Sequence, residues 1–100
     1  MKHELKIWPQ YYQAVADGSK TFEVRNNDRA FQKGDKVTLR EWDPSTYMDS
    51  DLTGSYEVTK GYTGNKLTFR IGYVLPIDDT RVVFSLLKEL EKSSNAKNTE

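Results

Sequence analysis

The sequence predicts a small α+β domain that is mainly β, with its strands closed into a barrel and one short helix after the first strand. Three observations support this prediction. Five short segments alternate hydrophobic and polar residues, as half-buried strands do. One segment spaces its apolar residues as a short amphipathic helix does. The 100 residues form one domain with a small core, and a strand-rich domain of this size closes most economically as a barrel. A twisted open α+β sheet is the alternative.

The first strand and the helix are expected within the first 18 residues. His3–Trp8 alternates, with Leu5 and Ile7 on one face. Pro9 suits the first turn of a helix, where its missing N–H costs nothing, and Gly18 suits the left-handed position just after the end. The apolar residues at helical spacing in this segment are Trp8, Tyr11, Tyr12 and Val15. Such a stripe usually faces the core, so we expect its packing to hold the short helix.

Further strands are expected after the helix, bounded by turn residues. The strand Lys20–Asn26 places Phe22 and Val24 on the face opposite to its charged side chains. The other expected strands are Lys36–Trp42, 67–75 and Val82–Leu87. Together with the first strand, they supply the walls of the predicted barrel.

Residues 1–90 are expected to form a single domain. Residues 91–100 offer nothing to bury and are expected to be a disordered tail. Within the domain, residues 43–65 contain proline, several glycines and many polar residues, which indicates a long loop with room for a short strand at Ser55–Lys60. A loop of this length in so small a domain is usually functional or mobile.

The composition excludes several classes of function. Lysine and arginine number 15, as do aspartate and glutamate, so a nucleic-acid site could only be a local patch. No apolar run is long enough to span a membrane, and the N-terminus lacks the apolar stretch of a signal peptide. The absence of cysteine removes disulfides and thiol chemistry and fits a cytoplasmic protein. His3 is the one histidine, so a zinc site would need mostly carboxylate ligands, and we expect neither a metal nor a cofactor. His3 itself is expected at the surface.

The densest chemical signal lies in the segment 18–25. Lys20 is a point charge and Arg25 a planar fork, and both suit a phosphate or the Hoogsteen edge of a purine. Glu23 could accept from an exocyclic amine. We therefore expect these three side chains to read a nucleotide.

Aromatic and basic side chains elsewhere would complete such a site. Trp8, Tyr11, Tyr12 and Trp42 offer faces on which a base could stack, at about 1–3 kcal/mol per base, although the first three are more usual as core residues. Arg29 and Arg40 would add backbone contacts that make binding sensitive to salt. The alternative is structural: Glu23 would pair across strands with a base such as Arg40 on a solvated face, and Arg25 with an acid such as Glu41. Each such pair would contribute less than about 1 kcal/mol.

The motif GxKxxExR is met in full by Gly18, Lys20, Glu23 and Arg25 and is identified as the signature of the ASCH domain, a branch of the PUA-like barrels. A longer pattern resembles a small uncharacterised ASCH-like family, a domain of unknown function, of phages and Gram-positive bacteria. It consists of His3–Pro9, Lys20–Arg25, Asn27–Arg29, Gly34–Asp35 and Leu39–Pro44. The resemblance is close over residues 3–44. The chain departs from it by inserting residues 47–61, whose acids would shield or repel an anionic ligand near the site.

The resemblance implies a compact PUA-like β-barrel with a cleft beside the signature strand, and a partner that is RNA or a modified nucleotide. The residues expected to bind that ligand are Lys20, Glu23, Arg25, Arg29, Arg40, Trp42 and Trp8.

Two other functions are considered. Some small ASCH proteins are amidohydrolases that remove an acetyl group from a modified cytidine; if this chain were one, the residues involved would be Lys20, Thr21 and Glu23. Glu23 stands where those enzymes carry a threonine, and a hydroxyl beside its base is what the chemistry requires, so binding is favoured over catalysis. The other alternative is a phage accessory protein that binds a protein partner through the acidic segment 41–57.

Overall fold

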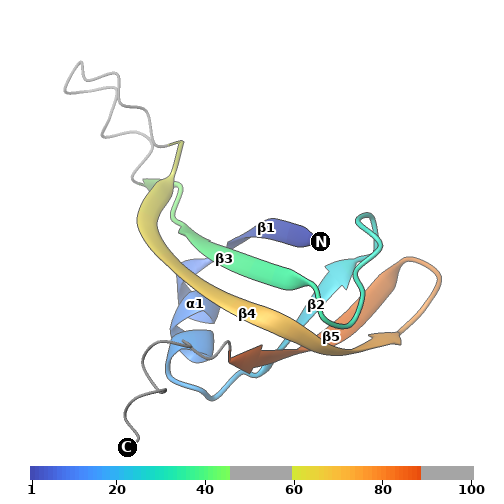
Figure 1. Cartoon of the computed structure of the whole chain (residues 1–100). Coiled ribbons are helices and arrows are strands. Elements are labelled where there is room, and N and C mark those ends of the chain that lie inside the picture. Colours follow the sequence, from blue (N-terminus) through green and yellow to red (C-terminus); the bar gives the residue numbers. More distant parts are fainter. Residues whose placement is uncertain (46–59, 89–100) are drawn as a thin grey trace, which may run out of the picture.

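Five strands form one sheet that curls into a half-barrel, with a short helix at one end (Figure 1). The computed structural model describes residues 1–45 and 60–88. In chain order its elements are β1 (Lys2–Ile7), α1 (Pro9–Ala16), β2 (Phe22–Asn26), β3 (Lys36–Trp42), β4 (Tyr62–Pro76) and β5 (Arg81–Lys88). The predicted class is confirmed: the domain is α+β and mainly β, with one short helix after the first strand.

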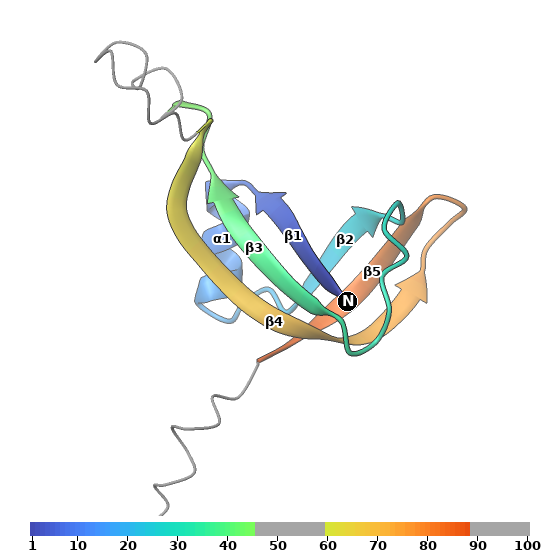
Figure 2. The same cartoon turned by 45° about the horizontal axis from the view of Figure 1, so that its top comes forward.

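The strand order β1-β3-β4-β5-β2 places the first two strands of the chain at opposite edges of the sheet. β1 runs parallel to β3, with Leu5 opposite Leu39, and all other neighbours are antiparallel. The segment containing α1 carries the chain from one edge to the other (Figure 2). In the part of the chain that the structure describes, β1 and β2 do not pair with each other. The expected barrel is therefore a curled sheet with an open seam between its two edge strands.

The curvature comes mainly from β4, which is long enough to pair with both β3 and β5. Its register with β5 shifts between Ile71 and Val74, and such a bulge bends the strand and increases its twist. The core fills the inner side of the curl; its most enclosed side chains are Phe84, Leu39, Ile71 and Val37. Tyr12 and Val15 of α1 complete the core at one end.

The helix has the predicted ends, but its aromatic stripe is divided. Pro9 is the first helical residue, and Gly18 follows the end with a φ of +86°. Tyr12 is buried as expected, whereas Trp8 and Tyr11 are 48% and 49% exposed. The expectation that the whole stripe is core is therefore wrong: Trp8 is the N-cap residue rather than part of the helix, and both Trp8 and Tyr11 line a cavity instead of the core.

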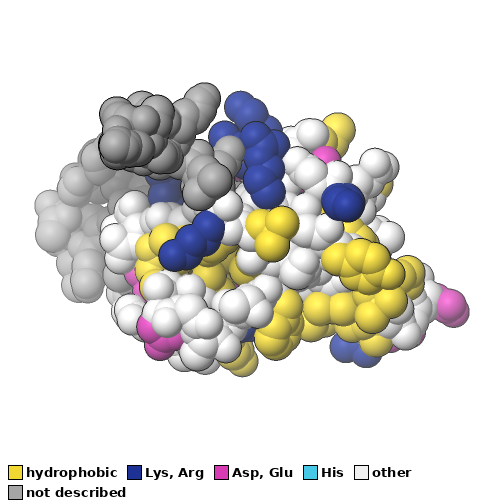
Figure 3. All heavy atoms as spheres, turned by 60° about the horizontal axis from the view of Figure 1, so that its bottom comes forward, with side chains coloured by type: hydrophobic (Ala, Val, Ile, Leu, Met, Phe, Trp, Pro, Cys, Tyr) yellow, Lys and Arg dark blue, Asp and Glu magenta, His cyan; other side chains and the backbone are white. Residues whose placement is uncertain are grey.

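The two faces of β2 alternate as predicted, with the charged face turned inward. Glu23 is 3% exposed and Arg25 is partly buried, whereas Phe22 and Val24 are exposed on the outer face. Other large apolar side chains exposed on β4, β5 and their connection are Tyr73, Leu75, Ile77 and Leu87. Figure 3 brings this side of the molecule forward and shows hydrophobic side chains gathered on it. The charged face of β2, which carries Glu23 and Arg25 of the motif, thus faces the interior of the half-barrel.

The long predicted loop ends earlier than expected, because β4 begins at Tyr62. Just before it, Gly61 has a φ of +95° and lies so close to Trp42 that a Cβ there would overlap the indole ring. The Trp42 indole N–H also donates to the carbonyl of Lys60, at 2.7 Å. The expected strand at Ser55–Lys60, except for Lys60 in this turn, lies outside the described residues. So do most of the insertion and the C-terminal tail.

His3 is buried, which corrects its expected place at the surface. It lies on the inner face of β1, and its Nε2 is 2.8 Å from Oδ2 of Asp35. The same oxygen accepts from the backbone N–H of Gln32, and Oδ1 accepts from the amino group of Met1. Burial of Asp35 opposes its ionisation, but these hydrogen bonds, that from His3 above all, outweigh it and lower the pKa of the Asp35 carboxyl.

Asp35→Asn is expected to lower the free energy of unfolding by about 1–3 kcal/mol at neutral pH, as loss of a partnered buried group does. A carboxyl whose pKa is lower in the folded state stabilises the fold above its unfolded pKa, about 4. The difference between wild type and variant should therefore persist at neutral pH and shrink as the pH falls through 4 toward the folded pKa. Urea unfolding from pH 3 to 7 measures it, with Asp28→Asn as the exposed control. A difference that grows on acidification would contradict this role of Asp35.

Candidate functional site

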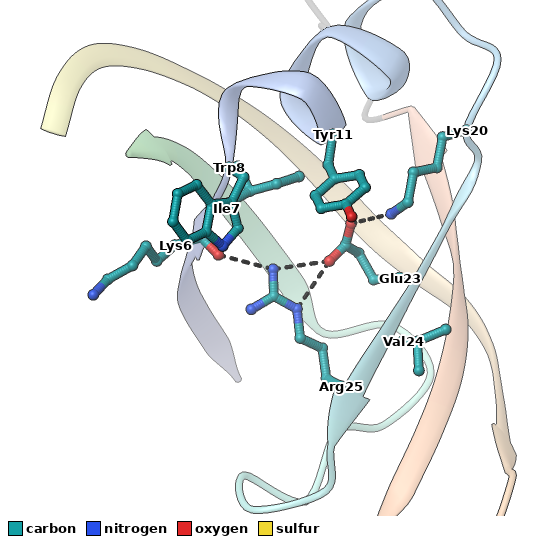
Figure 4. A pocket seen from close by; sticks show the side chains of 8 residues that line it. All are labelled: Lys6, Ile7, Trp8, Tyr11, Lys20, Glu23, Val24 and Arg25. Carbon is teal, nitrogen blue, oxygen red and sulfur yellow. Dashed lines mark hydrogen bonds and ion pairs between the residues drawn. The ribbon is translucent and has the colours of Figure 1, made fainter. Parts of the chain in front are cut away.

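A cavity of about 340 Å³ lies at the open seam, between β1, the start of α1 and β2 (Figure 4). Its lining residues are Lys6, Ile7, Trp8, Tyr11, Lys20, Glu23, Val24 and Arg25. This volume lies in the range of small-molecule sites, which hold roughly 300–1,000 Å³. The cavity therefore joins the signature motif to the first strand and the first turn of the helix.

The charged residues of the motif reach the cavity because of their spacing along the chain. Gly18 adopts the left-handed conformation that ends the helix, and the following residues bring the chain to Lys20 at the entry to β2. Glu23 and Arg25 are two residues apart on a strand, so both side chains point to the same, inner face. The three charged side chains consequently converge, as Figure 4 shows.

Glu23 binds both cations of the motif. One carboxylate oxygen accepts from Lys20 Nζ at 2.5 Å, and the other accepts from Arg25 Nε at 2.8 Å. Lys20 Nζ also donates to the carbonyl of Phe22, and Arg25 Nη2 donates to the carbonyl of Lys6 on β1. The Lys20 and Arg25 side chains remain 21% and 24% exposed. The buried carboxylate therefore fixes two cations that still reach solvent.

The structural alternative, in which Glu23 and Arg25 pair with Arg40 and Glu41 on a solvated face, is wrong. Arg40 lies 3.7 Å from the Glu4 carboxylate, and its guanidinium is 4.0 Å from the centroid of the Tyr62 ring. Glu41 is buried and accepts hydrogen bonds from side chains at the start of β4. The charged residues of β2 and β3 therefore belong to separate clusters.

Two aromatic side chains form part of the cavity wall beside the charges (Figure 4). Trp8 and Tyr11 are each about half exposed and both line the cavity. The Trp8 ring meets Trp42 edge to face, with 5.2 Å between ring centroids, and Lys6 Nζ lies 4.3 Å from the centroid of Trp42. Trp42 therefore supports Trp8 from behind without lining the cavity itself. An edge-to-face contact of this kind restrains both rings.

The structure brings together four of the predicted ligand-binding residues, namely Trp8, Lys20, Glu23 and Arg25. Trp42 supports this group, Arg29 lines an adjacent hollow, and Arg40 points to the outer side of β3 away from the cavity. Tyr11, expected as an aromatic face but not among the predicted ligand-binding residues, also lines the cavity. The lining residues that the sequence prediction missed are Lys6, Ile7 and Val24. Alternation in β1 identifies Lys6 as a polar-face residue, but only the three-dimensional fold places it beside β2.

The acidic segment 41–57 is described only at its start. Glu41 is buried, so it does not belong to an exposed acidic surface. Its Oε1 accepts from Thr63 Oγ1 and Asn65 Nδ2, both at 2.9 Å. The acids beyond residue 45 lie outside the described part of the chain.

The Glu41 charge also acts on a neighbouring side chain. Burial of Tyr12 and the nearby Glu41 charge raise the pKa of the Tyr12 hydroxyl.

Within residues 1–45 and 60–88, no group of three or more histidine, aspartate or glutamate side chains could hold a metal ion. The helix in the same residues is too short and polar to cross a membrane.

The fold and the cavity define a small half-barrel domain with a charged, aromatic-walled site at its open seam. Residues 2–86 match the family model described as a domain of unknown function, DUF3850, and the chain belongs to this family. The chain is also similar to the uncharacterised 12.9 kDa protein of the GpA 3′ region of Escherichia phage P2. The two are 30% identical over 88 residues, which cover 88% of this chain and 67% of the phage protein. The expectations of a domain of unknown function and of a phage relative are confirmed.

Proposed function

We propose that this domain is an ASCH-type member of the PUA-like barrels and binds RNA, or a nucleotide of it, in the cavity at the GxKxxExR strand. The main support is the composition of a single cavity. Two half-exposed aromatic rings line it together with two cations, and a buried carboxylate holds both cations in place. A nucleotide offers both matching parts, a flat base and an anionic phosphate.

The charge of the cavity supports an anionic ligand even though the chain is neutral. Lys20 and Arg25 stand in the cavity against the one carboxylate of Glu23, a formal excess of one positive charge. Lys6 contributes its carbonyl, and its Nζ lies over Trp42, away from the cavity. Such a local excess attracts an anion to the cavity. A base stacked on Trp8 or Tyr11 would lie within the same cavity as these cations.

The geometry favours binding over amide hydrolysis. Thr21 is exposed and does not line the cavity, so it does not offer a nucleophilic hydroxyl beside Lys20. Lys20 itself is held by the Glu23 carboxylate and by the Phe22 carbonyl. Hydrolysis by this route would need a hydroxyl next to its activating base, and the site instead presents fixed donors and aromatic faces.

Trp8→Ala is expected to weaken the binding of single-stranded RNA about tenfold, because one stacked base contributes about 1–3 kcal/mol. The measurement is fluorescence anisotropy of labelled oligonucleotides of mixed sequence at low salt, repeated at rising salt. Wild-type affinity should fall as salt rises. Tyr73→Ala, on the outer face and 65% exposed, is the matched control and should bind like wild type. Equal losses in both variants, or no binding by the wild type, would refute the proposed function.

A further inference from the structure

A second, smaller hollow of about 160 Å³ adjoins the cavity, and Arg25 lines both. The other residues around the hollow are Leu5, Asn26, Asp28, Arg29 and Phe31. Leu5 and Phe31 are buried core residues and form its apolar base, whereas the other side chains around it are polar or charged. The hollow continues the open seam along β1 and β2, away from the aromatic wall of the first cavity.

Two arginine side chains bridge the seam here in the same manner. Arg25 Nη2 donates to the carbonyl of Lys6 at 3.0 Å, and Arg29 Nη1 donates to the carbonyl of Glu4 at 3.2 Å. Lys6 and Glu4 are alternate residues of an edge strand, so their carbonyls point the same way, to the side that β3 does not occupy. The edge of β1 therefore holds the two guanidinium groups in a row.

Each guanidinium keeps donors for a further partner. Among the described residues, no hydrogen bond involves Arg25 Nη1 or Arg29 Nη2. The contact of Arg29 with Asp28 is 3.8 Å long, and the Asp28 side chain is 70% exposed. A carboxylate so well hydrated and so distant neutralises Arg29 only weakly. The hollow thus has two guanidinium groups, fixed by backbone carbonyls, with unused N–H groups.

We propose that this hollow is a phosphate subsite, so that the ligand is a nucleotide strand whose phosphate lies between Arg25 and Arg29. The proposal rests on the proposed function, because it assumes a base in the aromatic cavity. Guanidinium groups bind phosphate oxygens through paired, charge-assisted hydrogen bonds. Since Arg25 is shared, a base on the Trp8 side and the phosphate that joins it to the next nucleotide can occupy the two hollows at once. A free nucleoside would leave the second hollow unused.

The test compares nucleosides with the matching dinucleoside monophosphates, one pair for each of the four bases, by isothermal titration at fixed low salt. Wild type is expected to bind at least one dinucleoside monophosphate about tenfold more tightly than its nucleoside, and Arg29→Ala should remove that advantage without changing nucleoside affinity. Arg29→Lys, which keeps the charge but loses the planar fork, should retain only part of it. Arg81→Ala, which removes an equally exposed arginine paired with Asp78 in the β4–β5 turn, is the matched control and should change nothing.

The outcomes separate the two proposals. If wild type binds nucleosides and dinucleoside monophosphates equally, or if Arg29→Ala weakens both equally while remaining folded by circular dichroism, the phosphate subsite is refuted and nucleotide binding in the aromatic cavity stands. If neither kind of ligand binds at millimolar concentration, the proposed function fails and the subsite fails with it. If Arg29→Ala still binds the dinucleoside monophosphate more tightly than the nucleoside by the wild-type factor, the phosphate subsite is also refuted.

Discussion

Arg25→Ala is expected to weaken RNA binding about 100-fold, the largest loss among single substitutions in the site, because side chains at the centre of a binding site contribute about 2–4 kcal/mol. Arg25 lines both hollows and donates to both Glu23 and the Lys6 carbonyl. Its removal therefore takes away a cation, leaves the Glu23 carboxylate with one partner fewer, and removes a hydrogen bond that links β2 to β1. Fluorescence anisotropy with single-stranded RNA measures the loss, and circular dichroism shows whether the variant folds.

Two further variants separate these contributions. Arg25→Lys keeps the charge but cannot bridge Glu23 and the β1 carbonyl through a planar fork, so it should recover only a small part of the affinity. Arg40→Ala removes an arginine on the outer side of β3, 39% exposed and away from the cavity, and should bind nearly as well as wild type. Equal losses for Arg25→Ala and Arg40→Ala would mean that only the total charge matters, contrary to a defined site.

Glu23→Gln is expected to weaken binding as well, although it removes a negative charge from the proposed anion site. Charge alone would predict tighter binding of an anionic ligand when Glu23 is neutralised. The weakening follows because the buried Glu23 carboxylate holds Lys20 and Arg25 in place, and a neutral amide cannot accept from both cations equally well. The variant should also lose about 1–3 kcal/mol of unfolding free energy, as weakening the hydrogen bonds of a buried group does.

Urea unfolding and RNA titration of the same protein measure both effects of Glu23→Gln. Glu4→Gln, whose side chain is 68% exposed on β1, is the control and should change stability by less than about 1 kcal/mol. Tighter RNA binding by Glu23→Gln with unchanged stability would show that Glu23 is a bystander. Loss of stability with unchanged affinity would limit Glu23 to a structural role.

Local patterns in the sequence were sufficient to predict the elements of the fold. Lys36–Trp42 is found with its predicted bounds, because its alternation is uninterrupted and Gly34 precedes it. Pro9 and Gly18 likewise mark the ends of the helix segment. The open seam could not be predicted in this way, since it depends on the long-range pairing that places β1 and β2 at opposite edges. Periodicity carries no information about strand order.

Burial and the composition of the site depend on the same long-range pairing. Alternation separates the two faces of β2 but does not say which is inner; Glu23 can be buried only because two cations accompany it. His3 shares a face with Leu5, yet its partner Asp35 lies 32 residues away. The motif identified Lys20, Glu23 and Arg25, whereas Lys6 and Ile7 enter the site only through the fold.

The central claim, that the seam cavity binds RNA, is tested most directly by nuclear magnetic resonance of the isotopically labelled protein during titration with single-stranded RNA. The account predicts that the indole N–H of Trp8 and the Nε–H of Arg25 shift most, together with backbone amides at the start of α1 and in β2. Amides of the outer apolar face, such as that of Tyr73, should stay in place. Shifts confined to the outer face, or none at RNA concentrations that saturate binding by anisotropy, would contradict the claim.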